Sequence, residues 1–317
     1  MLQRYVRGPT PLRPYAAGVR AAEGTAGSHR GDEAGPVAAV ALSASSVQAG
    51  AAVGATLFPL IGPFGVTGMR QVVSAITLLA IARPPLLRLG LRRLTPAVLL
   101  GVVLVGMNFS LYSAVQRIGL GLGVTVEFLG PLAVALLGAG RTSARSTAAR
   151  AGCAALALAG VVLITDPLTG ARTDAAGLAF GGAAAVLWAA YILLSQRAGA
   201  LPGVTGTAVA SLTGTVLTLP VLVVLLLAVP RDALPHVLLL GVVTGVLSSA
   251  LPYSVDLLVL RRMPRSLFGM LQSLHPVAAA VFGLLVLGQV LGVVQVAGVA
   301  AVCAANVLAV LATRRRR

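Results

Sequence analysis

Two oppositely charged residues, Arg70 and Glu127, lie inside long runs of apolar residues. If each run is a helix that crosses a bilayer, Arg70 lies about 9 Å and Glu127 about 12 Å from the start of its run. Ionisable groups at such depth are costly, so they usually serve a function. We therefore expect both side chains to face a central cavity and to pair. The alternative is a purely structural ion pair that locks two helices together.

Two prolines follow polar residues by four positions inside apolar runs. A proline within a helix deprives the carbonyl four residues earlier of its donor, which is Glu127 for Pro131 and Gln272 for Pro276. Each site would combine a polar side chain with a freed backbone acceptor, an arrangement suited to an ammonium group or a hydroxyl. A simple kink, with the carbonyl satisfied by a neighbouring helix, explains the pattern equally well. Pro252 is a third expected kink.

His275 lies near the middle of its apolar run. Because imidazole titrates near neutrality, His275 is a candidate proton relay. A neutral, hydrogen-bonded role is favoured, since its own run contains no carboxylate. Asp256 lies near the end of the preceding run, where we expect it to meet Arg261 or Arg262 at the membrane surface.

Other polar and aromatic side chains inside apolar runs are candidates for lining the same cavity. Trp188 and Tyr191 are three positions apart and share one helix face, although an inner aromatic cluster explains that spacing equally well. The remaining candidates are Asn108, Tyr112, Gln48 and Asn306. Small residues such as Gly101 and Gly106 are expected to let helices approach closely.

The composition is that of an integral membrane protein. Of the 317 residues, 57% are apolar and 10% are charged, against roughly 25% charged in a soluble domain. The net charge of +16 comes from 24 basic residues, all of them arginine, and they are spread between the apolar runs. This distribution does not indicate nucleic-acid binding. Cys153 and Cys303 each lie inside an apolar run, so a disulfide is not expected.

The apolar runs predict an all-α fold with ten transmembrane helices, since about 20 apolar residues cross the hydrocarbon. The expected spans are 37–57, 64–82, 96–115, 119–138, 149–165, 176–195, 206–228, 235–259, 266–287 and 292–312. Residues 1–36 are expected to form a disordered cytoplasmic tail, unless the start codon is misplaced. Residues 313–317 are expected to form a short cytoplasmic basic tail.

The arginines predict the orientation of these spans. With a cytoplasmic N-terminus, 20 arginines fall on the inner side, and Arg117, Arg172 and Arg231 fall outside. Arg70 lies within a span. Positive residues concentrate on the cytoplasmic side of membrane proteins, so both termini are predicted to be cytoplasmic.

An internal repeat relates the two halves of the chain. The segment that begins at Arg117 aligns without gaps with the segment that begins at Arg262, and Pro131 matches Pro276. The offset of 145 residues covers five expected spans. An odd number of spans places the halves, 37–165 and 176–312, in opposite orientations. The fold is therefore predicted to be two inverted five-helix repeats, with a substrate site between them.

Three segments resemble a known family. They read GVTVEFLGPLAVALLGAGR, LPYSVDLLVLRRMPRSLFGMLQSLHPVAAAVFGLLVLGQVL and PFGVTGMRQVVSAITLLAIARP. The first is similar to the fourth span of EamA-type transporters in the drug/metabolite transporter superfamily, and more narrowly of its threonine and homoserine exporters. The second resembles the eighth and ninth spans of that branch, and the third resembles its second span. The likeness covers roughly residues 37 to 312.

The resemblance implies a secondary transporter that exports a small polar metabolite, such as threonine or homoserine, by alternating access with proton exchange. Protonation of Glu127 would then be coupled to substrate occupancy. Two positions of this chain differ from the residues that are usual in that branch. The branch usually has a glutamate where this chain has His275, and a Gly-Glu pair where this chain has Gly288 and Gln289. Both replacements remove a carboxylate.

The predicted partners are a small-molecule solute, protons and the lipid bilayer, with no cofactor, metal or nucleic acid. The chain has no P-loop, no metal-ligand spacing and no G-x-S-x-G elbow, which argues against an ATPase or another enzyme. The alternatives are a membrane-embedded partner or chaperone subunit without transport and, less favoured, a lipid-acting enzyme. The all-arginine basic set is typical of a GC-rich bacterial genome, which indicates a bacterial plasma membrane.

Overall fold

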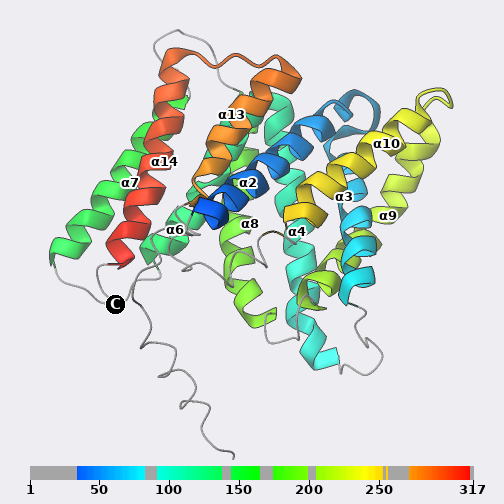
Figure 1. Ribbon diagram of the computed structural model, residues 1–317, viewed down its shortest axis with the longest axis horizontal. Helices are drawn as coiled ribbons and strands as arrows, with labels where there is room; N and C mark the ends of the chain where they lie inside the picture. Colours follow the sequence, from blue (N-terminus) through cyan, green and yellow to red (C-terminus); the bar gives the residue numbers. More distant parts are fainter. Residues whose placement is uncertain are drawn as a thin grey trace, which may run out of the picture.

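The computed structural model describes residues 34–82, 91–137, 144–164, 174–198, 205–252, 255 and 271–314. All regular secondary structure in these residues is helical (Figure 1). The α-helices are α2 (Ala34–Ala55), α3 (Phe58–Ala82), α4 (Leu91–Ile118), α5 (Leu120–Glu127), α6 (Leu129–Leu137), α7 (Ala144–Ile164), α8 (Ala175–Ala198), α9 (Thr205–Ala228), α10 (Leu234–Gly245), α13 (Leu274–Leu287) and α14 (Val293–Arg314). A π-helix, η2 (Val246–Ala250), continues α10.

The all-helical prediction is confirmed for the described residues. Seven helices are long and apolar enough to cross a membrane, and three shorter apolar helices accompany them at Ala148–Ile164, Leu234–Ser249 and Leu274–Leu287. Each of the ten predicted runs contains a described helix, and α5 and α6 share one run. The predicted tail lies outside the described residues up to position 33, and α2 begins at Ala34 rather than at 37.

The second predicted run begins just after a kink in its helix. Helix α3 begins at Phe58, with a kink at Gly62, whose φ is +62°. Glycine tolerates this left-handed conformation, so the chain bends just before Pro63 and the helix continues. Arg70 lies close to the middle of α3, and its depth in the bilayer stays a prediction.

The eighth and ninth runs are also less regular than predicted. Helix α10 ends at Gly245 and passes into η2, and Pro252 is buried just beyond it. Helix α13 begins at Leu274, after a turn at Gln272 and Ser273. Residues 256–270, including Asp256, Arg261 and Arg262, lie outside the described residues.

The helices pack in pairs that are distant in sequence. Helix α14 lies along α7, α3 packs on α9, α4 packs on α8, and α2 packs on α13 (Figure 1). Glycines allow the closest approaches. A Cβ on Gly101 would collide with the Ala210 carbonyl, and one on Gly130 would collide with the Ala185 carbonyl. Small residues at such contacts are typical of helix packing in membranes.

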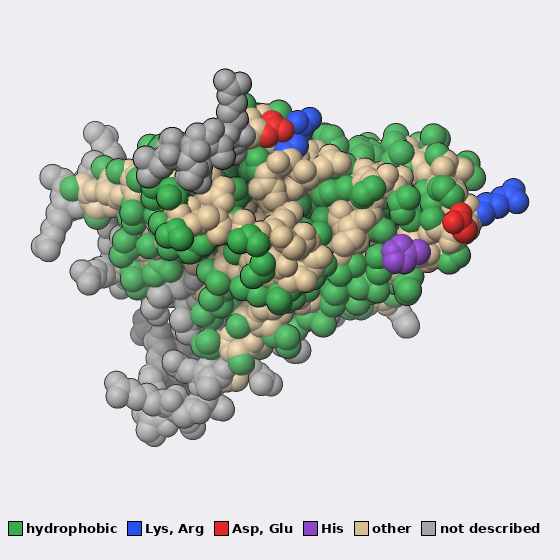
Figure 2. Space-filling view, turned by 90° about the horizontal axis from the view of Figure 1, so that it is seen from above, with side chains coloured by type: hydrophobic (Ala, Val, Ile, Leu, Met, Phe, Trp, Pro, Cys, Tyr) green, Lys and Arg blue, Asp and Glu red, His purple; other side chains and the backbone are tan. Residues whose placement is uncertain are grey.

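The described surface is strongly apolar. Leu227, Leu285 and Val293 are at least 71% exposed, on α9, α13 and the start of α14. Figure 2 shows hydrophobic side chains across most of the described face, with the few charged ones toward its margins. A surface of this kind suits contact with lipid tails rather than water.

Candidate functional site

Glu127 is the last residue of α5, directly before the helix breaks at Phe128. Every residue of α5 is buried, and Glu127 itself is only 4% exposed. Within the described part of the chain, no residue donates a hydrogen bond to its carboxyl group. A buried carboxyl group without donors is costly unless a ligand or a proton satisfies it. This position is therefore the first candidate for a solute contact.

Arg70 contacts the π-helix rather than Glu127. Its Nη2 donates to the Ser248 carbonyl at 3.0 Å, and its Nε donates to Ser249 Oγ at 3.5 Å. The expected salt bridge with Glu127 is not formed, and the salt bridge found among described residues joins Arg117 to Asp174. The positive charge of Arg70 nevertheless acts through space on both Glu127 and His275.

The π-helix explains why Arg70 contacts backbone. A π-helix shifts the hydrogen-bond register by one residue, so its carbonyls do not all find the usual donor. Here Ser46 Oγ donates to the Leu247 carbonyl at 2.8 Å, and Arg70 donates to the next carbonyl. Ser248 Oγ in turn donates to the Val47 carbonyl at 3.3 Å. Helices α2 and α3 are thus both bound to η2.

His275 is the second residue of α13, and its Nδ1 lies 3.1 Å from the Nε2 of Gln48 on α2. The backbone N–H of His275 donates to the Gln272 carbonyl at 3.0 Å. The expected free acceptor at Gln272 is therefore already occupied, and that part of the predicted cradle is wrong. The physical reason is the tight turn at Gln272, which supplies a donor three residues later instead of four.

Phe128 joins these groups into one site. Its ring lies 5.7 Å from the His275 ring and 4.6 Å, edge to face, from the Trp188 ring on α8. On α4, Tyr112 is fully buried and packs edge-on against Phe58, with 5.8 Å between ring centroids. The Tyr112 hydroxyl has no hydrogen-bond partner within the described residues. Polar and aromatic groups from α5, α8 and α13 therefore meet at the break between α5 and α6.

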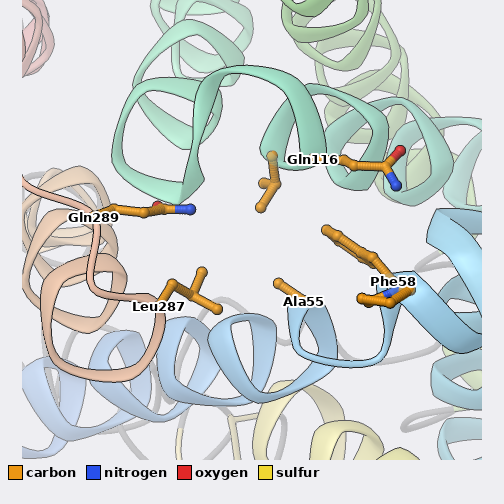
Figure 3. Close-up of a pocket in the computed structure, with 7 residues that line it drawn as sticks. Ala55, Phe58, Gln116, Leu287 and Gln289 are labelled. Carbon is orange, nitrogen blue, oxygen red and sulfur yellow. The ribbon is translucent and has the colours of Figure 1, made fainter.

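A pocket of about 280 Å³ opens at one end of the helices, close to the start of α5 (Figure 3). It is lined by Ala55, Phe58, Pro59, Val115, Gln116, Leu287 and Gln289. Gln289 extends into the opening opposite Phe58, and its Oε1 accepts the Leu120 N–H at 2.8 Å. Phe58 lines this pocket and also packs on Tyr112, so the pocket ends where the aromatic side chains begin.

Comparison with known proteins identifies the family. Residues 175–311 match the EamA-like transporter family. The chain is 36% identical to the threonine/homoserine exporter RhtA of Salmonella typhimurium LT2, over 88% of this chain and 92% of that protein. It is 35% identical to the RhtA of Escherichia coli K12, with the same coverage.

The chain belongs to the EamA-like transporter family, in the branch of these RhtA proteins. A solved crystal structure, 18% identical, superimposes with a TM-score of 0.58 over 88% of this chain and 98% of that chain. At this identity the likeness supports the fold alone. The chain is a multi-pass membrane protein, and its family consists of transporters rather than enzymes.

The structure shows what replaces the two carboxylates that the branch usually carries. His275 is paired with Gln48, as described above. Gln289 binds the first N–H of α5 with its side-chain oxygen, and Gly119 before it has a φ of +86°. A Cβ at Gly119 would lie 3.0 Å from Gln289 Oε1, so glycine also makes room for this contact. Gln289 thus caps the helix that ends at Glu127.

Other predicted site residues lie in a separate cluster or donate their hydrogen bonds within their own helix. Tyr191 packs with Leu94 and Met107 in a separate apolar cluster from the one that holds Trp188. Asn108 donates to the Leu104 carbonyl of its own helix at 2.8 Å, and Asn306 donates to the Val302 carbonyl at 3.0 Å.

Each of the two prolines follows shortly after an interruption of the helical hydrogen bonds. Pro131 is the third residue of α6, and Pro276 is the third residue of α13. In the first turn of a helix the missing N–H has no intrahelical partner to lose, so proline is tolerated there. No group of three metal-ligating side chains occurs in the part of the chain that the structure describes.

Three groups were missed by the sequence reasoning. They are Phe128, Ser46 and the pair Ser248–Ser249, which bind or surround the residues that were predicted. Phenylalanine and serine are common in transmembrane helices, so their types carried no signal. The adjacent serines shortly before Pro252 were the available hint of an irregular helix.

Proposed function

We propose that this member of the EamA family is a secondary transporter that exports a small amino acid, such as threonine or homoserine, by alternating access with proton exchange. The observation that carries the proposal is Glu127, a buried carboxyl group without a described donor at a broken helix. The names of the RhtA relatives support the choice of solute.

The chemistry follows from the charges of an amino acid. Its ammonium group is a donor and a cation, so it can satisfy the carboxylate of Glu127. A proton can satisfy the same carboxyl group when the solute has left. If the two compete for Glu127, release of solute on one side of the membrane is linked to uptake of a proton. Arg70 contributes a positive charge nearby that favours the solute's own carboxylate.

The proposed frame is a pair of inverted five-helix halves, at 37–165 and 176–312. Two observations support it. The helix break at Phe128 and the turn at Ser273 are 145 residues apart, the same offset as the sequence repeat. Helices that correspond at this offset also pack on each other in two cases, α3 with α9 and α7 with α14. A pseudo-two-fold axis between the halves places such a helix next to its counterpart in the other half.

In this frame the pocket beside Gln289 lies on the outer side of the membrane, and both termini lie in the cytoplasm of a bacterial cell. The solute would leave through this opening after passing Phe58. The halves would rock about the site at Phe128 to expose it to each side in turn.

An efflux screen tests the proposal. Proteoliposomes that contain the purified chain are loaded with single labelled amino acids, and efflux is compared with that from protein-free vesicles. We expect threonine or homoserine to leave at least tenfold faster with the chain present, and the internal pH to change as they leave. Equal efflux from both preparations for every amino acid would exclude the proposed transport.

A further inference from the structure

The pocket at the start of α5 has an apolar wall with two amide side chains in it. Five of its seven lining residues are apolar, the other two are Gln116 and Gln289, and none is charged. Pockets for drug-sized ligands have volumes of about 300–1,000 Å³, so the volume here, about 280 Å³, suits a smaller solute. What such a solute meets in this pocket depends on how the amides are oriented.

Gln289 is held at the pocket by both its backbone and its side chain. Gly288 ends α13 with a left-handed φ of +65°, and the N–H of Gln289 donates to the Gly283 carbonyl at 3.0 Å. The side-chain Oε1 accepts the N–H of Leu120 at 2.8 Å. A Cβ on Gly119 or on Gly283 would lie 3.0 or 3.1 Å from this oxygen, so the two glycines leave the space that it occupies.

The hydrogen bond from Leu120 decides which atom of the amide faces the pocket. A backbone N–H can only donate, so the amide atom that it binds must be the oxygen. Figure 3 shows the nitrogen of Gln289 pointing into the opening, opposite Phe58. Within the described residues this Nε2 has no hydrogen-bond partner. The pocket therefore presents a free amide donor, while the acceptor of the same side chain is already bonded.

A free amide donor selects a group that accepts hydrogen bonds. The carboxylate of an amino acid offers two charged acceptor oxygens, and hydrogen bonds to a charged acceptor are stronger than those between neutral groups. An ammonium group has donors only and gains nothing from Nε2. The RhtA branch usually has a glutamate at this position, which can accept the same backbone N–H but turns a negative charge toward the opening. This chain therefore treats an approaching carboxylate differently.

We propose that the pocket is an outer binding site for the carboxylate of the exported amino acid, with Gln289 Nε2 as its donor. This inference rests on the proposed function. The apolar lining, from Ala55, Phe58 and Leu287 among others, contacts the carbon atoms of the solute. Phe58 closes the inner end of the pocket, so a solute that arrives from outside occupies this site first. Affinity for external solute consequently depends on residue 289, although α5 separates it from Glu127.

Counterflow in right-side-out membrane vesicles tests the inference. Vesicles are loaded with unlabelled threonine, and their uptake of external labelled threonine is inhibited with unlabelled threonine or with threoninol. Threoninol keeps the ammonium and hydroxyl groups of threonine but has an alcohol in place of the carboxylate. For the native chain, we expect threonine to halve the uptake at a concentration at least tenfold lower than threoninol.

Gln289→Glu separates the donor from the cap, because a carboxylate still accepts the Leu120 N–H but cannot donate. The half-inhibiting concentration of threonine should rise at least tenfold, with no rise for threoninol. Gln295→Glu is the matched control and should keep the native values. Its Oε1 likewise accepts a backbone N–H, that of Gly292 at 3.0 Å, but Gln295 does not line the pocket.

Gln289→Met removes the donor without adding a charge, and its half-inhibiting concentration of threonine should rise at least fivefold. It carries the comparison if Gln289→Glu does not elute as a monodisperse protein. Native values in these variants would overturn the inference, as would an equal rise for threonine and threoninol or a native chain that does not distinguish the two. A native chain that takes up no labelled threonine would refute the proposed function as well.

Discussion

Arg70 uses its guanidinium group to hold two neighbouring groups of the π-helix, the Ser248 carbonyl and the Ser249 hydroxyl. A planar guanidinium can serve both at once, whereas a lysine ammonium is a single point of charge on a flexible stem. The residue therefore has two separable contributions, a hydrogen-bonding one at η2 and an electrostatic one at Glu127 and His275.

Two substitutions at this position separate these contributions. We expect Arg70→Ala to lower the free energy of unfolding by about 2 kcal/mol, since hydrogen bonds from a charged donor to partly buried groups contribute on that order. Arg70→Lys should lose much of this stability but keep the charge, so it should retain more transport than Arg70→Ala. Thermal melting in detergent and threonine efflux measure the two effects.

Arg231→Ala, in the exposed segment between α9 and α10, is the matched control and should change neither quantity. Equal melting temperatures for the native chain and Arg70→Ala would show that the contacts with η2 do not contribute to stability.

At the residue scale the sequence was informative about rare side chains only. Glu127, Arg70 and His275 stand out because polar groups are scarce in apolar runs, and the structure finds all three in one electrostatic neighbourhood. Their partners were not predictable. The Ser248 carbonyl is a backbone group, and its availability depends on a π-helix that leaves no clear mark in an apolar sequence.

Glycine contacts decide how closely the helices approach at the scale of elements. Gly160 on α7 and Gly298 on α14 face each other. A Cβ on Gly160 would lie 2.8 Å from the Gly298 carbonyl, and a Cβ on Gly298 would lie 2.7 Å from the Gly160 carbonyl. Carbonyl oxygens cannot move aside without moving the helix, so the pair sets the spacing of α7 and α14.

We expect Gly160→Val to destabilise the protein by about 1–3 kcal/mol, the usual cost of overpacking a close contact. Gly152→Val is the control, because Gly152 is on the same helix and no atom lies within 4 Å of where its Cβ would be. Thermal melting of both variants checks the prediction. It is wrong if the two substitutions lower the melting temperature equally.

An exposed ion pair joins α4 to the start of α8. Arg117 Nη1 donates to Asp174 Oδ2 at 2.8 Å, and Asp174 Oδ1 accepts the backbone N–H of Ala176 at 2.8 Å. The hydrogen bond from Arg117 is the main cause that holds the pKa of Asp174 below its ordinary value. A lowered pKa in the folded state means that the contribution to stability exists above the ordinary carboxyl pKa, and is lost as pH falls through the lowered value.

We therefore expect Asp174→Asn to melt slightly below the native chain at pH 6, with the difference closing as pH falls below about 4, the ordinary range of an aspartate. The effect should be small, because exposed pairs contribute little. Melting curves across this pH range measure it. A difference that grows toward acid pH would contradict the assigned direction.

Helix positions were predictable, and helix breaks were predictable only where a proline or glycine marks them. Apolar runs locate the helices because hydrocarbon requires a minimum length of apolar sequence. Pro131 marks the interruption at Phe128, because it cannot donate to the Glu127 carbonyl. The same uniformity hides other irregularities, such as the π-helix η2. Gly62 and Pro63 suggested a boundary, and α3 is indeed kinked there, because Gly62 has a non-helical conformation.

At the scale of the whole molecule, two weak signals in the sequence agree with the packing. The offset of 145 residues relates Pro131 to Pro276, and both residues are the third of a helix that follows a break. Two pairs of helices that correspond at this offset, α3 with α9 and α7 with α14, pack on each other. The relative rotation of the helices, which decides what faces the centre, could not be read from apolar runs without polar periodicity.

The account depends on one claim, that a small amino acid crosses the membrane at a site whose charge is Glu127. Threonine counterflow in proteoliposomes tests it most directly, with the native chain, Glu127→Gln and the exposed-carboxylate control Asp232→Asn measured under the same conditions. The account predicts that the native chain and Asp232→Asn exchange threonine at equal rates, and that Glu127→Gln folds normally but exchanges it at least a hundredfold more slowly. Native rates of exchange by Glu127→Gln would contradict it.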